Sequence, residues 1–145
     1  MKIENIIRRE ILLDTLSEKE IDDCDWINLS NDEGVETAYK KAKEYEDIFS
    51  YYEICDAESE FRYSGDEVSI KGLEVDGGRH YEAKRVAKKI RDGSYISWVF
   101  YYGGGKHAQP EIIDWMREED GASLVNCVET EKLVTVKDFS KIDNL

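Results

Sequence analysis

The chain has few of the residues that cross-link, bind metals or stiffen the backbone in small folds: three cysteines, two histidines and one proline among 145 residues. Cys24, Cys55 and Cys127 are odd in number and far apart, whereas a secreted disulfide scaffold needs an even, dense set. We therefore expect reduced thiols and a cytoplasmic protein, in the producing or host cell. The N-terminus lacks a charged-then-apolar leader pattern. No apolar run approaches the roughly 20 residues of a membrane span, so we expect no membrane partner.

Sequence motifs for metal binding and catalysis are also missing. There is no Cys-x-x-Cys and no closely spaced histidine pair for zinc. Asp22, Asp23 and Asp25 lack the glycine and closing glutamate of a calcium loop. A nucleophilic Cys–His pair needs His80 or His107 beside a cysteine in space, and the spacing does not indicate one. We expect no metal, no cofactor and no catalytic residue, which favours a protein that is not an enzyme.

The charge is strongly negative and unevenly distributed. Thirty-three acids against 20 lysines and arginines give a net charge of −13. Residues 14–67 hold eighteen acids against five bases, and so carry the whole excess; residues 1–13 are at +1 and residues 68–145 at −1. This charge opposes direct binding of nucleic acid or anionic membranes by the whole surface. It suits a partner with a basic surface.

Some of the acidic residues lie where a helix is expected to begin. Acids in a first turn interact favourably with the helix dipole, as Asp32 and Glu33 would. Nine further acids exceed what capping needs, and their mutual repulsion lowers stability. We expect these to bind a basic partner: Asp22, Asp23, Asp25, Glu44, Glu46, Asp47, Asp56, Glu58 and Glu60. Tyr101, on an exposed face rimmed by acids, would be the aromatic anchor. The alternative is that the acidity serves solubility alone.

The N-terminal third reads as helical. Apolar residues recur at helical spacing over 3–16. Capping boxes at 17–20 and 30–33 predict a short second helix and a third one running to about Ile48. Aromatic residues at 49–55 then predict a strand. Segments 60–63 and 68–71 flank Ser64-Gly65 and predict a hairpin.

The second part reads as a sheet with two helices. Residues 79–92 predict a helix ended by Gly93, with a basic face formed by Arg79, Lys84, Arg85, Lys88, Lys89 and Arg91. Residues 95–102 are apolar on both faces and predict a central strand. Pro110 opens a short helix that Gly121 ends. Segments 124–128 and 133–136 predict a last hairpin.

These elements predict one domain over 1–145, helical in 1–48, with a sheet and two helices in 49–140. Sequential hairpins favour an α+β fold in which the helical N-terminal part packs on a mainly antiparallel sheet of about five strands.

The most unusual string is Gly103, Gly104, Gly105, Lys106 and His107. A glycine-rich turn before a helix can present backbone N–H groups to a phosphate, and Lys106 adds positive charge. The string lacks the spacing and the Ser/Thr of a P-loop and is not the dinucleotide fingerprint. Its alternative reading is a flexible connection between strand and helix.

In size, acidity and lack of catalytic motifs, the whole chain resembles phage and plasmid anti-defence proteins, including anti-restriction and anti-CRISPR inhibitors. The resemblance implies a non-enzymatic inhibitor of a basic, nucleic-acid-binding protein, such as a nuclease of a host defence system. It would act as a DNA mimic or by steric block. The alternative is a small enzyme or phosphate- or nucleotide-binding domain that uses Gly103–His107 and the basic helix.

Overall fold

The computed structural model describes residues 1–44, 48–78, 80–131, 133, 135 and 137–142. The first half folds into helices α1 (Ile3–Thr15), α2 (Glu18–Asp22), α3 (Asp32–Lys43) and α4 (Tyr51–Tyr63). The prediction of a helix over 3–16 is confirmed by α1. The cap predicted at 17–20 forms, because Ser17 and Glu20 bond reciprocally. The box predicted at 30–33 does not form as predicted: the cap of α3 is Asn31, whose side chain accepts from the Gly34 N–H at 2.8 Å, and not Ser30.

Helix α4 replaces the strand predicted at 49–55 and the hairpin arm predicted at 60–63, so both predictions are wrong. The Ser50 hydroxyl caps this helix by accepting from the Glu53 N–H at 3.4 Å. Ile54, Ala57 and Phe61 are buried at the i, i+3 and i+7 spacing of a helix that packs on one side. Burial of this stripe outweighs the β-propensity of the neighbouring tyrosines.

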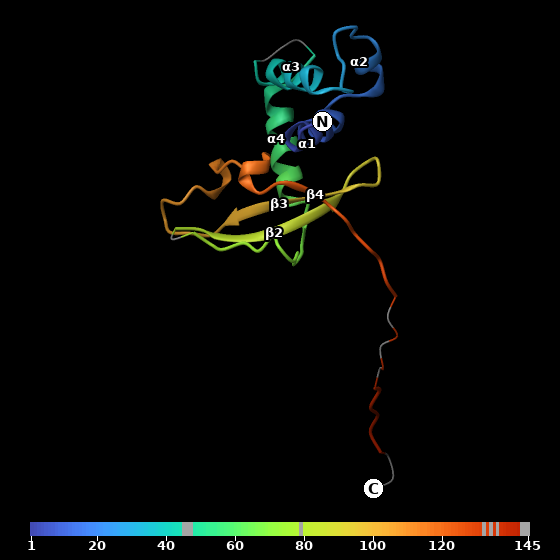
Figure 1. The fold of residues 1–145 in the computed structure, drawn as a ribbon, viewed down its shortest axis with the longest axis vertical. Helices are drawn as coiled ribbons and strands as arrows, with labels where there is room; N and C mark the ends of the chain where they lie inside the picture. Colours follow the sequence, from blue (N-terminus) through green and yellow to red (C-terminus); the bar gives the residue numbers. More distant parts are fainter. Residues whose placement is uncertain (45–47, 79, 132, 134, 136, 143–145) are drawn as a thin grey trace.

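The second half forms a four-stranded sheet of β1 (Asp66–Glu67), β2 (Glu82–Lys89), β3 (Tyr95–Tyr102) and β4 (Ser123–Val125). Every neighbouring pair is antiparallel, in the order β1-β2-β3-β4. The predicted α+β class and antiparallel sheet are therefore confirmed, with four strands where about five were expected. The strand predicted over 95–102 is β3, between two neighbours as expected (Figure 1).

The basic helix predicted over 79–92 is wrong, because residues 82–89 form β2; Arg79 lies outside the described residues. All eight residues of β2 pair with β3, and this pairing overrides the helix-forming composition. Lys84 and Lys88 still share a face, now through the two-residue period of a strand. The Lys88 ammonium lies 4.5 Å from the centre of the Phe61 ring.

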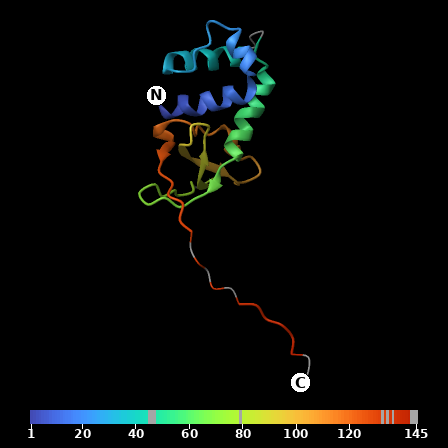
Figure 2. The same cartoon turned by 90° about the vertical axis from the view of Figure 1, so that its right-hand side faces the viewer.

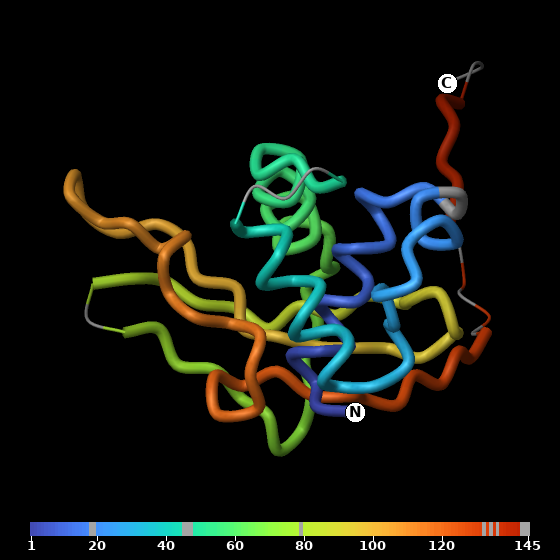
Figure 3. The backbone as a smooth tube through the Cα atoms, turned by 90° about the horizontal axis from the view of Figure 1, so that it is seen from above, coloured from blue at the N-terminus to red at the C-terminus, as the bar shows by residue number. Residues whose placement is uncertain are grey.

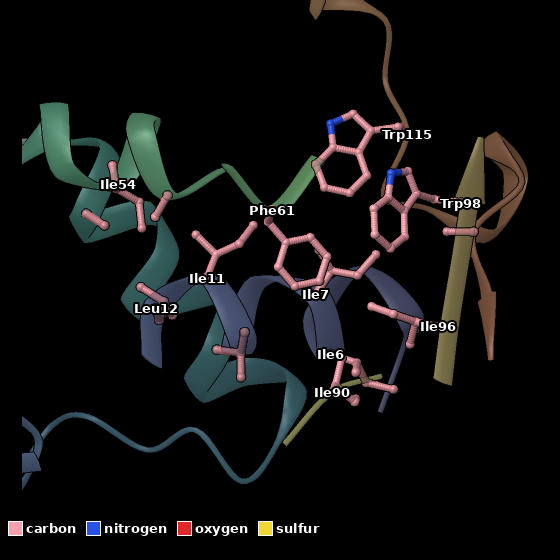
Figure 4. Packing of buried hydrophobic residues seen from close by; sticks show 14 of the residues in the cluster. Ile6, Ile7, Ile11, Leu12, Ile54, Phe61, Ile90, Ile96, Trp98 and Trp115 are labelled. Atoms are coloured by element: carbon pink, nitrogen blue, oxygen red, sulfur yellow. The ribbon is translucent and has the colours of Figure 1, made fainter. Parts of the chain in front are cut away.

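The core lies between the helical layer and one face of the sheet (Figures 1, 2 and 4). Its centre is an aromatic triad. The Phe61 ring lies 5.3 Å from Trp98 and 6.1 Å from Trp115, and the two tryptophans are 5.6 Å apart, centroid to centroid. Ile7 and Ile11 of α1 are fully buried against it. Helix α4 is thereby fixed to the sheet, and its other side faces solvent.

The opposite face of the sheet is held by Arg85 of β2, which is buried. Its guanidinium donates to the carbonyls of Leu73 and Gly121, at 2.8 and 2.9 Å, and to the Ser97 hydroxyl at 3.0 Å. One arginine thus ties the segment before β2 and the segment before β4 to the same sheet face.

The segment after β3 is less regular than predicted. Pro110 does open a helical turn, but this is a short 3-10 helix, η1 (Pro110–Ile112), and it ends well before Gly121. A second one, η2 (Glu118–Asp120), ends at Gly121 with a left-handed φ of 99°.

Of the predicted last hairpin, only 124 and 125 are in a described strand, as part of β4, and they pair with β3. Part of its second arm, at 134 and 136, lies outside the described residues. The described residues after β4 run away from the body in Figure 1. None of the helices in the described part of the chain combines the length and apolar character that crossing a membrane requires.

Candidate functional site

The fold keeps the acidic half of the sequence in one layer. Residues 1–63 hold eighteen acids against eight lysines and arginines, and their described elements are the four helices. Residues 64–125 hold eleven acids against nine bases and carry the sheet. The asymmetry of the sequence is therefore also an asymmetry between the two layers of the structure.

Within the helical layer, carboxylates gather in a depression between the end of α1 and the outer side of α4. The depression has a volume of about 300 Å³ and is lined by Asp14, Thr15, Glu53, Asp56, Ala57 and Glu60. Of the predicted partner-binding residues, the structure brings Asp56 and Glu60 together here. It adds Asp14 and Glu53, which the sequence reasoning did not single out.

The outer side of α4 also carries two exposed aromatic rings. At about 3.6 residues per turn, positions 52, 53, 56, 60 and 63 fall on one face roughly 100° wide. Tyr52 is 75% exposed and Tyr63 is 65% exposed, so a tyrosine stands at each end of the row of carboxylates. We call this face the α4 stripe: Tyr52, Glu53, Asp56, Glu60 and Tyr63.

The three carboxylates of the α4 stripe are not neutralised within the described part of the chain. Glu53, Asp56 and Glu60 form no ion pair with any described lysine or arginine. Like charges at i,i+3 and i,i+4 destabilise a helix by about 0.2–0.5 kcal/mol per pair. Asp14 differs, because the Arg91 guanidinium lies 2.6 Å from it. The stripe therefore keeps an uncompensated charge.

The remaining predicted acids lie elsewhere. Asp22, Asp23 and Asp25 are exposed at the end of α2 and in the loop that follows it. Glu44 lies 4.0 Å from Lys40, one turn earlier along the chain. Glu46 and Asp47 lie outside the described residues.

Glu58 is turned away from the α4 stripe and is already engaged. It accepts a hydrogen bond from the Tyr39 hydroxyl and forms a 2.9 Å ion pair with Lys43. Burial, followed by the charge of Glu58, raises the pKa of Tyr39. Burial by itself lowers the pKa of Lys43, but the hydrogen bond to Glu58 and the charge of Glu58 outweigh this effect, so the pKa of Lys43 is raised. These contacts tie α3 to α4 and give Glu58 a structural partner.

Tyr101 does not join the acids of the α4 stripe. Successive side chains of a strand point to opposite faces, so Tyr101 lies on the face opposite Trp98 and Phe100, which pack towards the helices. Its backbone carbonyl accepts a hydrogen bond from the Arg62 guanidinium. The exposed tyrosines beside the acids are Tyr52 and Tyr63, which a helical wheel of 51–63 would have placed there.

The glycine-rich string forms a second site, at the end of the β2–β3 pair. The chain before β2 and the chain after β3 lie at the same end of the sheet (Figures 1 and 3). Their residues line an open pocket of about 860 Å³. Its described lining is Gly78, His80, Tyr81, Glu82, Gly103, Gly104, Gly105, Lys106, His107 and Ala108. The structure thus brings together all five residues of the predicted phosphate loop and adds His80, Tyr81 and Glu82. No cysteine is among this lining.

The molecule thus has two candidate surfaces, the α4 stripe and the pocket at the end of β2 and β3. No family model, characterised protein or solved structure matches the chain.

Proposed function

We propose that the protein is a non-enzymatic binding protein whose α4 stripe docks onto a basic surface of a partner protein. The observation that carries this proposal is the row Glu53, Asp56 and Glu60, exposed on one helix face without a described counter-charge. Such a row lowers the stability of the free protein. A cationic partner would turn the same repulsion into attraction.

The partner that fits best is a protein that itself binds nucleic acid. Glu53 and Glu60 are seven residues apart, which corresponds to about 10 Å along a helix axis. Three carboxylates over that length are about 5 Å apart along the axis, which is roughly two thirds of the charge density of one DNA strand, with one phosphate per about 3.4 Å. A lysine- and arginine-lined groove built for phosphates would accept such a row. The protein would then inhibit this partner, such as a nuclease of a host defence system, by charge mimicry or by steric block.

Tyr52 and Tyr63 would add affinity that charge alone does not give. Tyrosine is enriched among the residues that dominate binding energy, because its ring buries a large area with few rotatable bonds. Tyr52 contacts Tyr51 in an edge arrangement with ring centroids 5.9 Å apart. Tyr63 packs on Phe100 at 5.1 Å and is held more firmly. Both rings stay largely accessible to a partner.

The test is capture from a host lysate by the immobilised protein, at low and at high salt, with two matched variants. Variant Glu53→Gln/Asp56→Asn/Glu60→Gln neutralises the α4 stripe. Variant Asp22→Asn/Asp23→Asn/Asp25→Asn removes the same charge at the loop after α2. Because exposed charges are screened by salt, capture by the wild type should fall steeply as salt rises.

We expect the α4 variant to lose the salt-sensitive partner and the α2-loop variant to retain it. Tyr52→Ala should weaken capture of the same partner without changing its salt dependence. If both triple variants capture equally, the stripe is not the docking surface. If both lose the partner equally, only the total charge matters and the proposed site is wrong.

A further inference from the structure

The pocket at the end of β2 and β3 is independent of the α4 stripe and holds both histidines of the chain. His80 precedes β2 and His107 follows β3, and Lys106 lies beside His107. All three side chains are exposed within an open pocket of about 860 Å³. Three groups able to carry positive charge thus share one concave site on a protein of net charge −13.

The shape of this pocket is fixed by glycine. Gly103 and Gly104 have left-handed φ values of 65° and 96°, a region that side chains disfavour. A Cβ at Gly104 would lie 2.5 Å from the Cβ of Ala108 and 2.6 Å from the His80 carbonyl oxygen. The backbone of the loop therefore packs directly against the segment before β2. Only glycine permits this close approach.

The loop also presents backbone donors. The N–H groups of Gly104, Gly105, Lys106 and His107 make no hydrogen bond to any described residue, whereas the Ala108 N–H donates to Gly105 at 2.9 Å. Consecutive free N–H groups in a glycine turn are a common way to bind phosphate oxygens. Combined with nearby cations, they suit an anion far better than a neutral ligand.

We propose that this pocket binds a phosphate group, held by the free N–H groups of the loop together with Lys106, His80 and His107. Glu82 also lines the pocket, and its Oε2 would lie 3.1 Å from a Cβ at Gly103. A carboxylate repels a fully ionised phosphate, but it accepts a hydrogen bond from a hydroxyl. Glu82 therefore favours a phosphate that carries or adjoins a hydroxyl, such as a phosphate monoester of a sugar or nucleoside.

Besides the two imidazoles, the charged or titratable groups that line the pocket are Lys106, Glu82 and Tyr81. The acidic helices repel an anion only at long range, and salt screens that field beyond about 8 Å at physiological ionic strength.

The direct test follows the two imidazoles by NMR while inorganic phosphate or adenosine monophosphate is added at constant pH. Chloride at the same ionic strength is the reference. We expect both imidazole signals to move saturably with one midpoint. A lower midpoint for the nucleotide identifies a phosphate monoester as the ligand, and a lower one for inorganic phosphate identifies the free ion.

Surface variants keep this test independent of folding. Lys106→Gln should raise the midpoint about fivefold, as expected for the loss of one partly screened charge. Lys89→Gln removes an exposed lysine at the far end of β2 and should leave the midpoint unchanged. The proposal is overturned if neither anion moves the imidazole signals more than chloride does, or if Lys106→Gln titrates like the wild type. Either result would leave the α4 stripe unaffected.

Discussion

Replacing Arg91 by alanine should loosen the contact between the helical layer and the sheet. Arg91 follows β2, and its guanidinium bridges two carboxylates of α1, Glu10 and Asp14. The Glu10 side chain is only 6% exposed, while the Arg91 side chain is 48% exposed. The substitution therefore leaves the nearly buried carboxylate of Glu10 without its cation.

The magnitude follows from this exposure. Breaking a fully buried ion pair by removing one partner costs about 3–5 kcal/mol. Here water reaches the pair from the arginine side, so we expect about half of that, ~2 kcal/mol. In a protein of this length, such a loss lowers the melting temperature by about 4–8 °C.

Urea denaturation of Arg91→Ala, Glu10→Gln and the double variant measures the effect and its cause. Because Glu10→Gln removes the buried charge, the double variant should be about 1 kcal/mol more stable than additivity of the single variants predicts. Lys40→Ala, which removes an exposed helix pair with Glu44, is the control and should change stability by less than about 0.5 kcal/mol. Strict additivity, or an Arg91→Ala protein as stable as the control, would show that Glu10 does not depend on Arg91 for its stability in the fold.

Three further predictions concern stability. Burial and Glu58 raise the pKa of Tyr39, so the folded protein keeps a proton that the unfolded chain releases above about pH 10. Stability should therefore be intact below that pH and fall above it, and urea unfolding at about pH 9 and 11 should show a smaller fall in Tyr39→Phe. Gly121→Ala should destabilise by about 1 kcal/mol more than Gly93→Ala: both glycines have a left-handed φ, but only at Gly121 does a Cβ meet a neighbour, Val99, at 2.8 Å. Equal losses in the two glycine variants would rule out the packing contribution. Phe61→Ala should cost about 3–5 kcal/mol by opening the aromatic triad, and a loss under 1 kcal/mol in thermal or urea unfolding would contradict the packing described.

The elements predicted well are those whose pattern is local. Helix α1 has an unbroken apolar stripe, and β3 is apolar on both faces. In each case the pattern of apolar residues is visible within a short stretch of sequence. Segment 82–89 is rich in alanine, lysine and arginine, and only its pairing with β3 makes it a strand. Segment 51–63 shows the opposite error, because part of it was predicted as a strand and it forms a helix. Its tyrosines favour a strand, while Ser50 and Glu53 supply a helix cap.

The candidate surfaces show the same limit. The acidic excess of 14–67 is visible in the sequence, but the α4 stripe appears only once 51–63 is read as a helix. Glu58 belonged to the same list of acids and turned out to face Tyr39 and Lys43, a partner choice that depends on how α3 packs on α4. Likewise, the glycine string was conspicuous, whereas His80 joins it only because β2 and β3 pair along their full length.

Carboxyl footprinting of the complex shows directly which carboxylates the partner covers. A water-soluble carbodiimide labels exposed carboxylates, and mass spectrometry compares the labelling of each one with and without the captured partner. We predict that the partner protects Glu53, Asp56 and Glu60, while Asp22 and Asp23 are labelled to the same extent in both samples. Protection of the two aspartates with full labelling of the α4 stripe would contradict it.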